Sequence, residues 1–280
     1  MTIRKKWALS ALASGGFLIL GIVVLVLNPG VLYAHQTTTR QYTIYHDRPL
    51  DPALLLRLEQ ARHLVRTSEV FDNALRLEVC LNDGSRYPGL IQTLWSPAFA
   101  WGFYNKVVLN GEVQAEANRL SLRAYAWNLT SLLAHEMTHC YQFHHFGWWH
   151  SNPQARYPTW KWEGYAEYVA RHPRGQQGLQ QNMARLQQAE QTAPDRWDIQ
   201  LADSSSTSRE YFTYGVLTEY CLDIKRMTFQ QVLQDTASEE AIHQQLLNWY
   251  RKEKVAEMKN AAEPMSTVTP VLHVPTSVHP

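Results

Sequence analysis

One pentapeptide, His135-Glu136-Met137-Thr138-His139, constrains the fold of this chain more than any other feature. The apolar residues around it have helical spacing, and residues four apart in a helix lie on one face. His135 and His139 can therefore direct two imidazole nitrogens at one metal ion, while Glu136 lies beside them and can reach a metal-bound water. The pattern predicts a Zn²⁺ site in which the metal lowers the pKa of that water and the carboxylate accepts its proton.

Two histidines leave such a site incomplete, because a catalytic zinc normally takes three protein ligands. His145 is one candidate for the third, since it lies where the metzincin pattern H-E-x-x-H-x-x-G-x-x-H places its last histidine. Gln142 replaces the glycine of that pattern, so we expect the helix to continue and to carry His145 about 120° away from the metal face. Glu163, on the next predicted helix, is the other candidate.

The segment Trp162-Glu163-Gly164-Tyr165-Ala166-Glu167-Tyr168 follows the helical H-E-x-x-H pattern. Together they resemble the gluzincin branch of zinc metallopeptidases, in the peptidase MA superfamily. The resemblance implies a zincin-like α+β fold, zinc bound by His135, His139 and Glu163, and Glu136 as the general base. The spacing between the second histidine and the glutamate is longer than in the best-known members, and no segment that would capture a substrate amine is recognisable.

Three more side chains are candidates for the same site. Glu167 shares the helical face of Glu163, so it either holds the N–H of a ligating histidine or is an ordinary solvated or salt-bridged carboxylate. Tyr211 and Tyr214 are candidates to stabilise an oxyanion, a role that a tyrosine or histidine has in this branch, although core packing explains them equally well. The aromatic and histidine-rich stretch 141–150 lines substrate subsites, lies against a bilayer, or packs behind the H-E-x-x-H helix.

The N-terminal segment predicts a membrane anchor. Arg4, Lys5 and Lys6 precede an uncharged apolar run from Trp7 to Leu27, which is long enough to span a bilayer core of about 30 Å. The basic residues favour a cytoplasmic start, so residues 1–34 form the N-terminus and anchor, and the catalytic part lies on the extracytoplasmic side. A signal peptide cleaved near Ala34 is the alternative.

Composition excludes several other classes. With 26 Lys+Arg against 25 Asp+Glu, the chain has no basic surplus to attract nucleic acid, and 45% apolar residues are too many for a disordered chain. The three cysteines, Cys80, Cys140 and Cys221, lack C-x-x-C spacing and allow at most one internal disulfide.

Hydrophobic periodicity predicts an α+β fold, with a small N-terminal sheet and a mainly helical C-terminal part. The predicted strands are 41–46, 75–81, 98–103 and 106–109. The predicted helices are 51–66, 119–146, 159–171, 178–191, 209–225, 228–233 and 239–258. Residues 35–260 are expected to form one domain, and the proline-containing stretch 261–280 a flexible tail.

These observations give one expectation and one alternative. The expectation is a membrane-anchored zinc peptidase, with endopeptidase activity favoured, that acts on a peptide or protein substrate. An edge strand between Ala98 and Leu109 would pair with the extended substrate backbone. The alternative is a zincin-like binding module of the cell envelope without catalysis, although a purely structural metal site has no use for Glu136 as a base.

Overall fold

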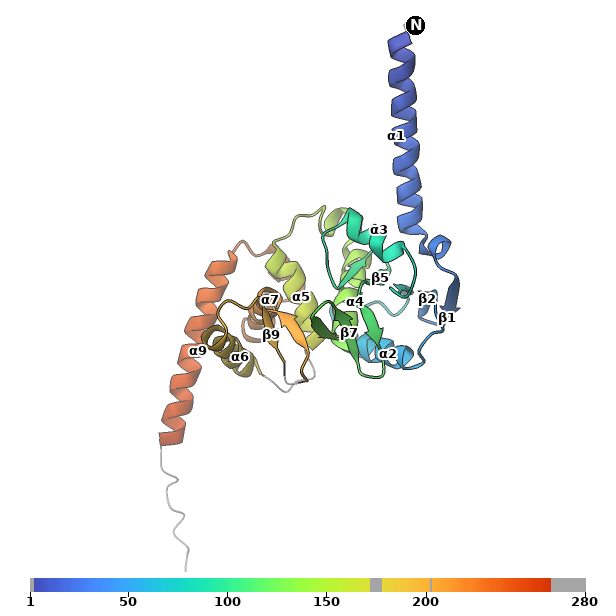
Figure 1. Ribbon diagram of the computed structural model, residues 1–280. Helices are drawn as coiled ribbons and strands as arrows, with labels where there is room; N and C mark the ends of the chain where they lie inside the picture. Colours follow the sequence, from blue (N-terminus) through green and yellow to red (C-terminus); the bar gives the residue numbers. More distant parts are fainter. Residues whose placement is uncertain (1–2, 172–177, 202, 263–280) are drawn as a thin grey trace, which may run out of the picture. The chain divides into compact units, whose positions relative to one another are not determined.

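The computed structural model describes residues 3–171, 178–201 and 203–262. It divides into two compact units, Met1–Ala237 and Ser238–Pro280. The first unit contains a mixed β-sheet, two smaller antiparallel sheets and most of the helices, which confirms the predicted α+β class (Figure 1). The second unit contains α9 (Glu239–Ala262); the rest of the predicted tail lies outside the described residues.

A five-stranded sheet forms the framework of the first unit. Its outer pairs are antiparallel and its inner pairs parallel, and the edge strand β4 is joined to β5 by a tight turn at Tyr104 and Asn105. In spatial order the strands are β1 (His35–Thr38), β2 (Tyr42–His46), β3 (Leu77–Cys80), β5 (Lys106–Leu109) and β4 (Ala100–Phe103). Four of these strands were predicted, and β1 was not.

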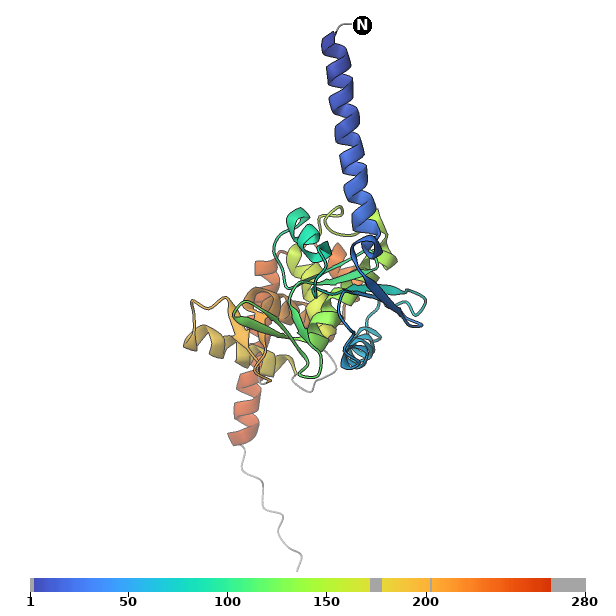
Figure 2. The same ribbon diagram turned by 45° about the vertical axis from the view of Figure 1, so that its right-hand side comes forward.

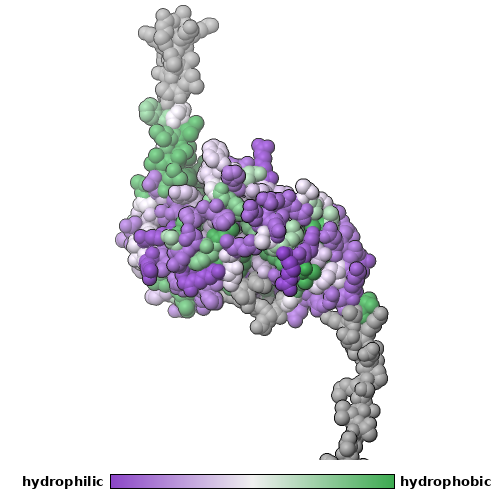
Figure 3. Space-filling view, turned by 180° about the vertical axis from the view of Figure 1, so that it is seen from behind, coloured by the Kyte–Doolittle hydropathy of each residue, from purple (hydrophilic) through white to green (hydrophobic). Residues whose placement is uncertain are grey.

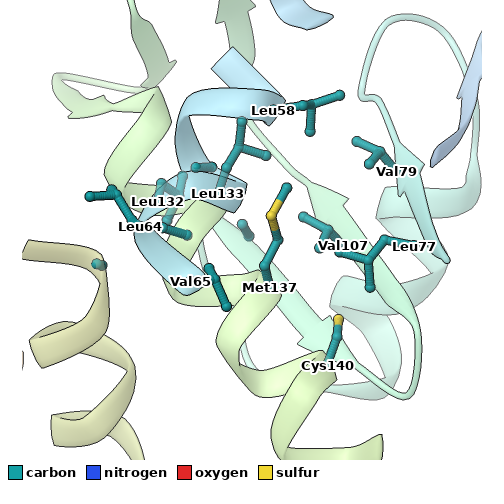
Figure 4. Packing of buried hydrophobic residues seen from close by; sticks show 14 of the residues in the cluster. Leu58, Leu64, Val65, Leu77, Val79, Val107, Leu132, Leu133, Met137 and Cys140 are labelled. Carbon is teal, nitrogen blue, oxygen red and sulfur yellow. The ribbon is translucent and has the colours of Figure 1, made fainter. Parts of the chain in front are cut away.

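Helices cover both faces of this sheet. Because successive strand residues point to opposite faces, Val107 belongs to the large core cluster with α2 (Ala53–Val65) and α4 (Leu129–Phe146), whereas Val108 belongs to a smaller cluster with α3 (Tyr87–Leu94). Figure 4 shows the large core, where Met137 of α4 lies among side chains of α2, β3 and β5. The H-E-x-x-H helix is therefore held between α2 and the sheet.

The predicted helix 119–146 begins ten residues later than expected, at Leu129. Residues before it form the hairpin β7 (Arg119–Leu122) and β8 (Tyr125–Asn128), which pairs with β6 (Glu112–Gln114) beside α4 (Figures 1 and 2). Asn128 fixes the boundary, because its side chain accepts a hydrogen bond from the Ser131 N–H as an N-cap. The wrong prediction came from reading the apolar residues of the hairpin as helical.

The remaining helices confirm their predictions to within a few residues. They are α5 (Thr159–Arg171), α6 (Leu179–Thr192), α7 (Arg209–Glu219), which continues into one π-helical segment (Tyr220–Ile224), and α8 (Phe229–Gln234). Thr228 and Gln231 form a capping box at the start of α8. The short hairpin of β9 (Asp198–Gln200) and β10 (Ser206–Ser208) was not predicted.

The first helix, α1 (Ile3–Leu27), corrects the prediction of a membrane anchor over 7–27. The side chains from Gly15 to Leu27 give this part of the helix a hydrophobic surface (Figure 3). Within the described part of the chain, no helix has both the length and the apolar character that crossing a membrane requires. The predicted anchor is therefore wrong, and the single-pass localisation that depended on it is wrong with it.

Glu219, at the end of α7, makes the stability of the first unit depend on pH. Burial raises the pKa of its carboxyl to about 7, against the opposing hydrogen bond from Asn182 Nδ2 to Glu219 Oε2 at 2.8 Å. In the unfolded chain the same carboxyl has the ordinary glutamate pKa of about 4.3. Protonation of Glu219 therefore stabilises the folded state fully below about pH 4, and this stabilisation is lost as the pH rises through about 7.

We therefore expect Glu219→Gln to raise the free energy of unfolding by about 3 kcal/mol at about pH 8 and to leave it nearly unchanged at about pH 4. Urea unfolding at both pH values checks this. A stabilisation of the same size at both would mean that ionisation of Glu219 is not its cause.

Candidate metal centre

Three ligand atoms from two helices converge on one point. His135 Nε2 and His139 Nε2, both on α4, lie 3.1 Å apart, and Glu163 Oε2 on α5 lies 3.2 Å from the first and 3.1 Å from the second. Tetrahedral zinc ligands at about 2.0–2.1 Å from the metal would be about 3.3 Å from one another. The spacing and chemistry of these three atoms therefore fit a metal ion, as the sequence predicted for this triad.

Two glycines allow the elements around the triad to approach closely. A Cβ on Gly102 of β4 would overlap the backbone of Glu136, so the edge strand can lie directly on the H-E-x-x-H helix only without a side chain there. A Cβ on Gly164 of α5 would similarly overlap the Tyr214 carbonyl and the Thr218 hydroxyl of α7. The glycine after Glu163 thus brings α7 against the ligand helix.

The far ring nitrogens of the two histidines face different groups. His139 Nδ1 is hydrogen-bonded to Gln142 Oε1 at 2.8 Å, whereas His135 Nδ1 makes no hydrogen bond and lies 3.5 Å from Glu167 Oε1, within ion-pair distance. Glu167 is in turn held by Arg171, whose Nε donates to Glu167 Oε2 at 2.6 Å. The acceptor at Nδ1 lets His139 present its Nε2 lone pair to a metal, and the nearby Glu167 carboxylate favours the same orientation of the His135 ring.

The charges of these groups depend on one another. Burial alone would lower the pKa of both His135 and His139, but nearby carboxylates outweigh it and raise both pKa values. At His135 these are chiefly Glu163 and Glu167, and at His139 they are Glu163 and Glu136. Burial would likewise raise the pKa of Glu163, and the two histidines lower it instead. Arg171 and His135 lower the pKa of Glu167 to about 2. Both carboxylates are therefore ionised at neutral pH.

Glu136 differs from the ligand carboxylate. It is buried and lines the same cavity, yet it does not belong to the metal-binding triad. Burial raises the pKa of its carboxyl, against the opposing effects of His135, His139 and a hydrogen bond from the Gly102 backbone N–H. A carboxylate made more basic beside the triad suits proton transfer.

The two candidate tyrosines have different surroundings. The Tyr211 ring is parallel to that of His135, with ring centroids 5.9 Å apart, and it lines the cavity. Burial and the nearby Glu163 and Glu136 carboxylates raise its pKa, so its hydroxyl remains a donor. Tyr214 is buried and donates its hydroxyl proton to Glu210 Oε1 at 2.7 Å, outside the cavity lining. Only Tyr211 therefore lies with the triad.

A cavity of about 610 Å³ opens in front of the triad. The edge strand β4 forms one wall, where Phe99 O accepts a hydrogen bond from Asn110 N at 2.9 Å. Since hydrogen-bonded pairs alternate along an antiparallel ladder, Ala100 and Gly102 direct their backbone groups away from β5. The N–H and C=O of Ala100 are thus free of β5 and can pair with the backbone of an extended chain.

The stretch 141–150 has mixed surroundings. Phe143 and Trp148 line the cavity, whereas Tyr141 is fully buried in the core. Trp149 is 77% exposed and does not line the cavity. His145 is also exposed, at the end of a helix that continues to Phe146, and it lies outside the triad. The alternative third ligand of the sequence analysis is thus not part of the group that could hold a metal.

Sequence reasoning missed several residues in and beside the site. Gln142 lies three residues after His139 and Arg171 four after Glu167, so helical spacing alone places each beside its partner. Phe99, Trp127 and Trp197 form a stacked aromatic wall, with ring centroids 3.8 Å and 5.7 Å apart. No sequence signal indicated that wall, because Trp127 lies in the unpredicted β8 and Trp197 directly before the unpredicted β9.

Comparison of the chain with protein-family models, with curated proteins and with solved structures gives no match in any of the three. The functional assignment therefore depends on the geometry of the triad and its cavity.

Proposed function

We propose that this chain is a zinc-dependent peptidase with a zincin-like fold, in which endopeptidase activity is favoured. One observation carries the proposal: His135, His139 and Glu163 converge on one point at a cavity, beside a buried glutamate that is not one of the three. A structural metal site would be closed and would have no use for Glu136.

The donor set favours zinc over harder cations. Two imidazole nitrogens and one carboxylate oxygen are ligands of catalytic zinc, whereas Mg²⁺ and Ca²⁺ prefer oxygen ligands throughout. Bound Zn²⁺ would supply Lewis acidity, which acidifies a water molecule and polarises a substrate carbonyl. His135, His139 and Glu163 would hold it, with His139 already oriented through the hydrogen bond at its Nδ1.

The chain itself supplies the remaining groups for hydrolysis. The Glu136 carboxylate accepts a proton from the attacking water and can pass it to the leaving amine, since burial has raised its pKa. The Tyr211 hydroxyl, kept protonated by its surroundings, can donate a hydrogen bond to the oxyanion that develops on the carbonyl oxygen.

The cavity fits an extended peptide. An edge strand can add a further strand, and the outward backbone groups of Ala100 in β4 are available to a substrate chain. Four partly exposed aromatic side chains surround the cavity: Trp95, Tyr104, Trp148 and Trp197. Such a lining favours peptides with large apolar side chains.

The proposal is tested with the purified full chain. We expect about one zinc per chain by elemental analysis and cleavage of internally quenched peptides. Phenanthroline should abolish cleavage, and Zn²⁺ should restore it. A chain that binds zinc stoichiometrically but cleaves no member of a diverse peptide library would be a binding module instead.

Trp148 and the adjacent Trp149 test the apolar subsite as a matched pair. Trp148 lines the cavity and Trp149 does not, while both are exposed. We expect Trp148→Ala to lower kcat/KM about tenfold for peptides with large apolar residues, because about 1.4 kcal/mol of apolar contact is lost. Trp149→Ala should leave kcat/KM unchanged. Equal losses in the two variants would contradict a specific subsite at Trp148.

A further inference from the structure

Gln142 connects the two helices that carry the metal ligands. It lies on α4 and is fully buried, with its Oε1 2.8 Å from His139 Nδ1. Its Nε2 donates to the Trp162 carbonyl on α5 at 3.3 Å, and Trp162 directly precedes Glu163. A single side-chain amide therefore contacts one ligand and the residue next to another.

The hydrogen bond to Trp162 determines which end of the Gln142 amide faces His139. A carbonyl oxygen can only accept, so the amide nitrogen of Gln142 must face Trp162 and the amide oxygen must face His139. That oxygen can only accept as well, so His139 Nδ1 carries the proton. His139 Nε2 is then left with a lone pair directed at the metal position.

The two histidines differ in their outer partners. His135 faces the carboxylate of Glu167, which Arg171 neutralises, whereas His139 faces a neutral amide. The site already contains three carboxylates, the ligand Glu163 and its neighbours Glu136 and Glu167. A neutral partner at His139 orients the ring without adding a fourth negative charge.

We infer that Gln142 is the positioning residue that fixes the His139 ring and its separation from Glu163 for metal binding. The inference rests on the proposed metal site, but not on peptidase activity. Outer partners of ligating histidines contribute about 10–100-fold to metal affinity.

The experiment measures Zn²⁺ affinity of the full chain by competition with a chelator, and the visible absorption spectrum of the Co²⁺-loaded chain. Gln142→Met keeps the side-chain length and removes both hydrogen bonds, so we expect 10–100-fold weaker Zn²⁺ binding and an altered Co²⁺ spectrum. Gln142→Glu keeps the acceptor for His139 and loses the donor to Trp162, so its affinity should lie between Gln142→Met and wild type.

Thr138→Val is the matched control. Thr138 is fully buried on the same helix, and its hydroxyl donates to the Ala134 carbonyl within that helix, so this variant should leave both metal readouts unchanged. Wild-type metal affinity in Gln142→Met, or equal losses in Gln142→Met and Thr138→Val, would overturn the inference. Tight metal binding without peptide cleavage would overturn only the proposed function, and a wild-type chain that binds neither Zn²⁺ nor Co²⁺ would overturn both.

Discussion

Glu136→Gln should remove peptide cleavage while leaving the zinc content, the fold and the thermal stability close to those of wild type. Glu136 is not part of the triad, so an uncharged side chain of the same shape leaves the ligands in place. The amide cannot accept the proton of the attacking water. Loss of a positioned general base costs about 10²–10⁴-fold in rate, so kcat should fall by that factor with little change in KM.

The measurement compares single-turnover cleavage and peptide binding in the two proteins at equal zinc content. The variant should still bind the peptides that wild type cleaves, because the β4 edge and the aromatic lining are unaltered. Equal behaviour of wild type and Glu136→Gln in every assay would mean that Glu136 is not a base, and the binding-module alternative would then take the place of the peptidase.

The parts of the site that lie on one helix were predictable from local spacing. His135 and His139 share a face because they are four residues apart, and the same rule places Gln142 beside His139. Glu163 was predicted only through the resemblance, since its approach to the histidines depends on the packing of α5 against α4. The Gly102 contact was unpredictable from sequence, because it depends on β4 lying against α4.

The errors in the fold arose where long-range pairing overrides local pattern. Residues 119–128 carry apolar residues at spacings compatible with a helix, yet they pair as strands with each other and with β6. The N-cap at Asn128 was the available local signal for the true helix start. β9 and β10 are three residues each, too short to give a periodicity that distinguishes a strand from a loop.

Loss of the third metal ligand should have a second large effect, on zinc binding. Comparing Glu163→Ala with His145→Ala shows which of the two residues is that ligand. Glu163 Oε2 lies 3.1–3.2 Å from both ligating nitrogens, whereas His145 is exposed beyond the metal face. Glu163→Ala should therefore raise the dissociation constant for Zn²⁺ by about 10³-fold or more, beyond the 10–100-fold expected for an outer-shell residue. It should also leave His135 and His139 facing each other without their shared carboxylate.

His145→Ala should retain about one zinc per chain and wild-type cleavage, because the His145 ring contacts only Phe146 among the described aromatic side chains. Elemental analysis after dialysis against a weak chelator checks both variants, with circular dichroism to confirm that each is folded. Retention of zinc by folded Glu163→Ala together with its loss from His145→Ala would place the third ligand on the H-E-x-x-H helix itself.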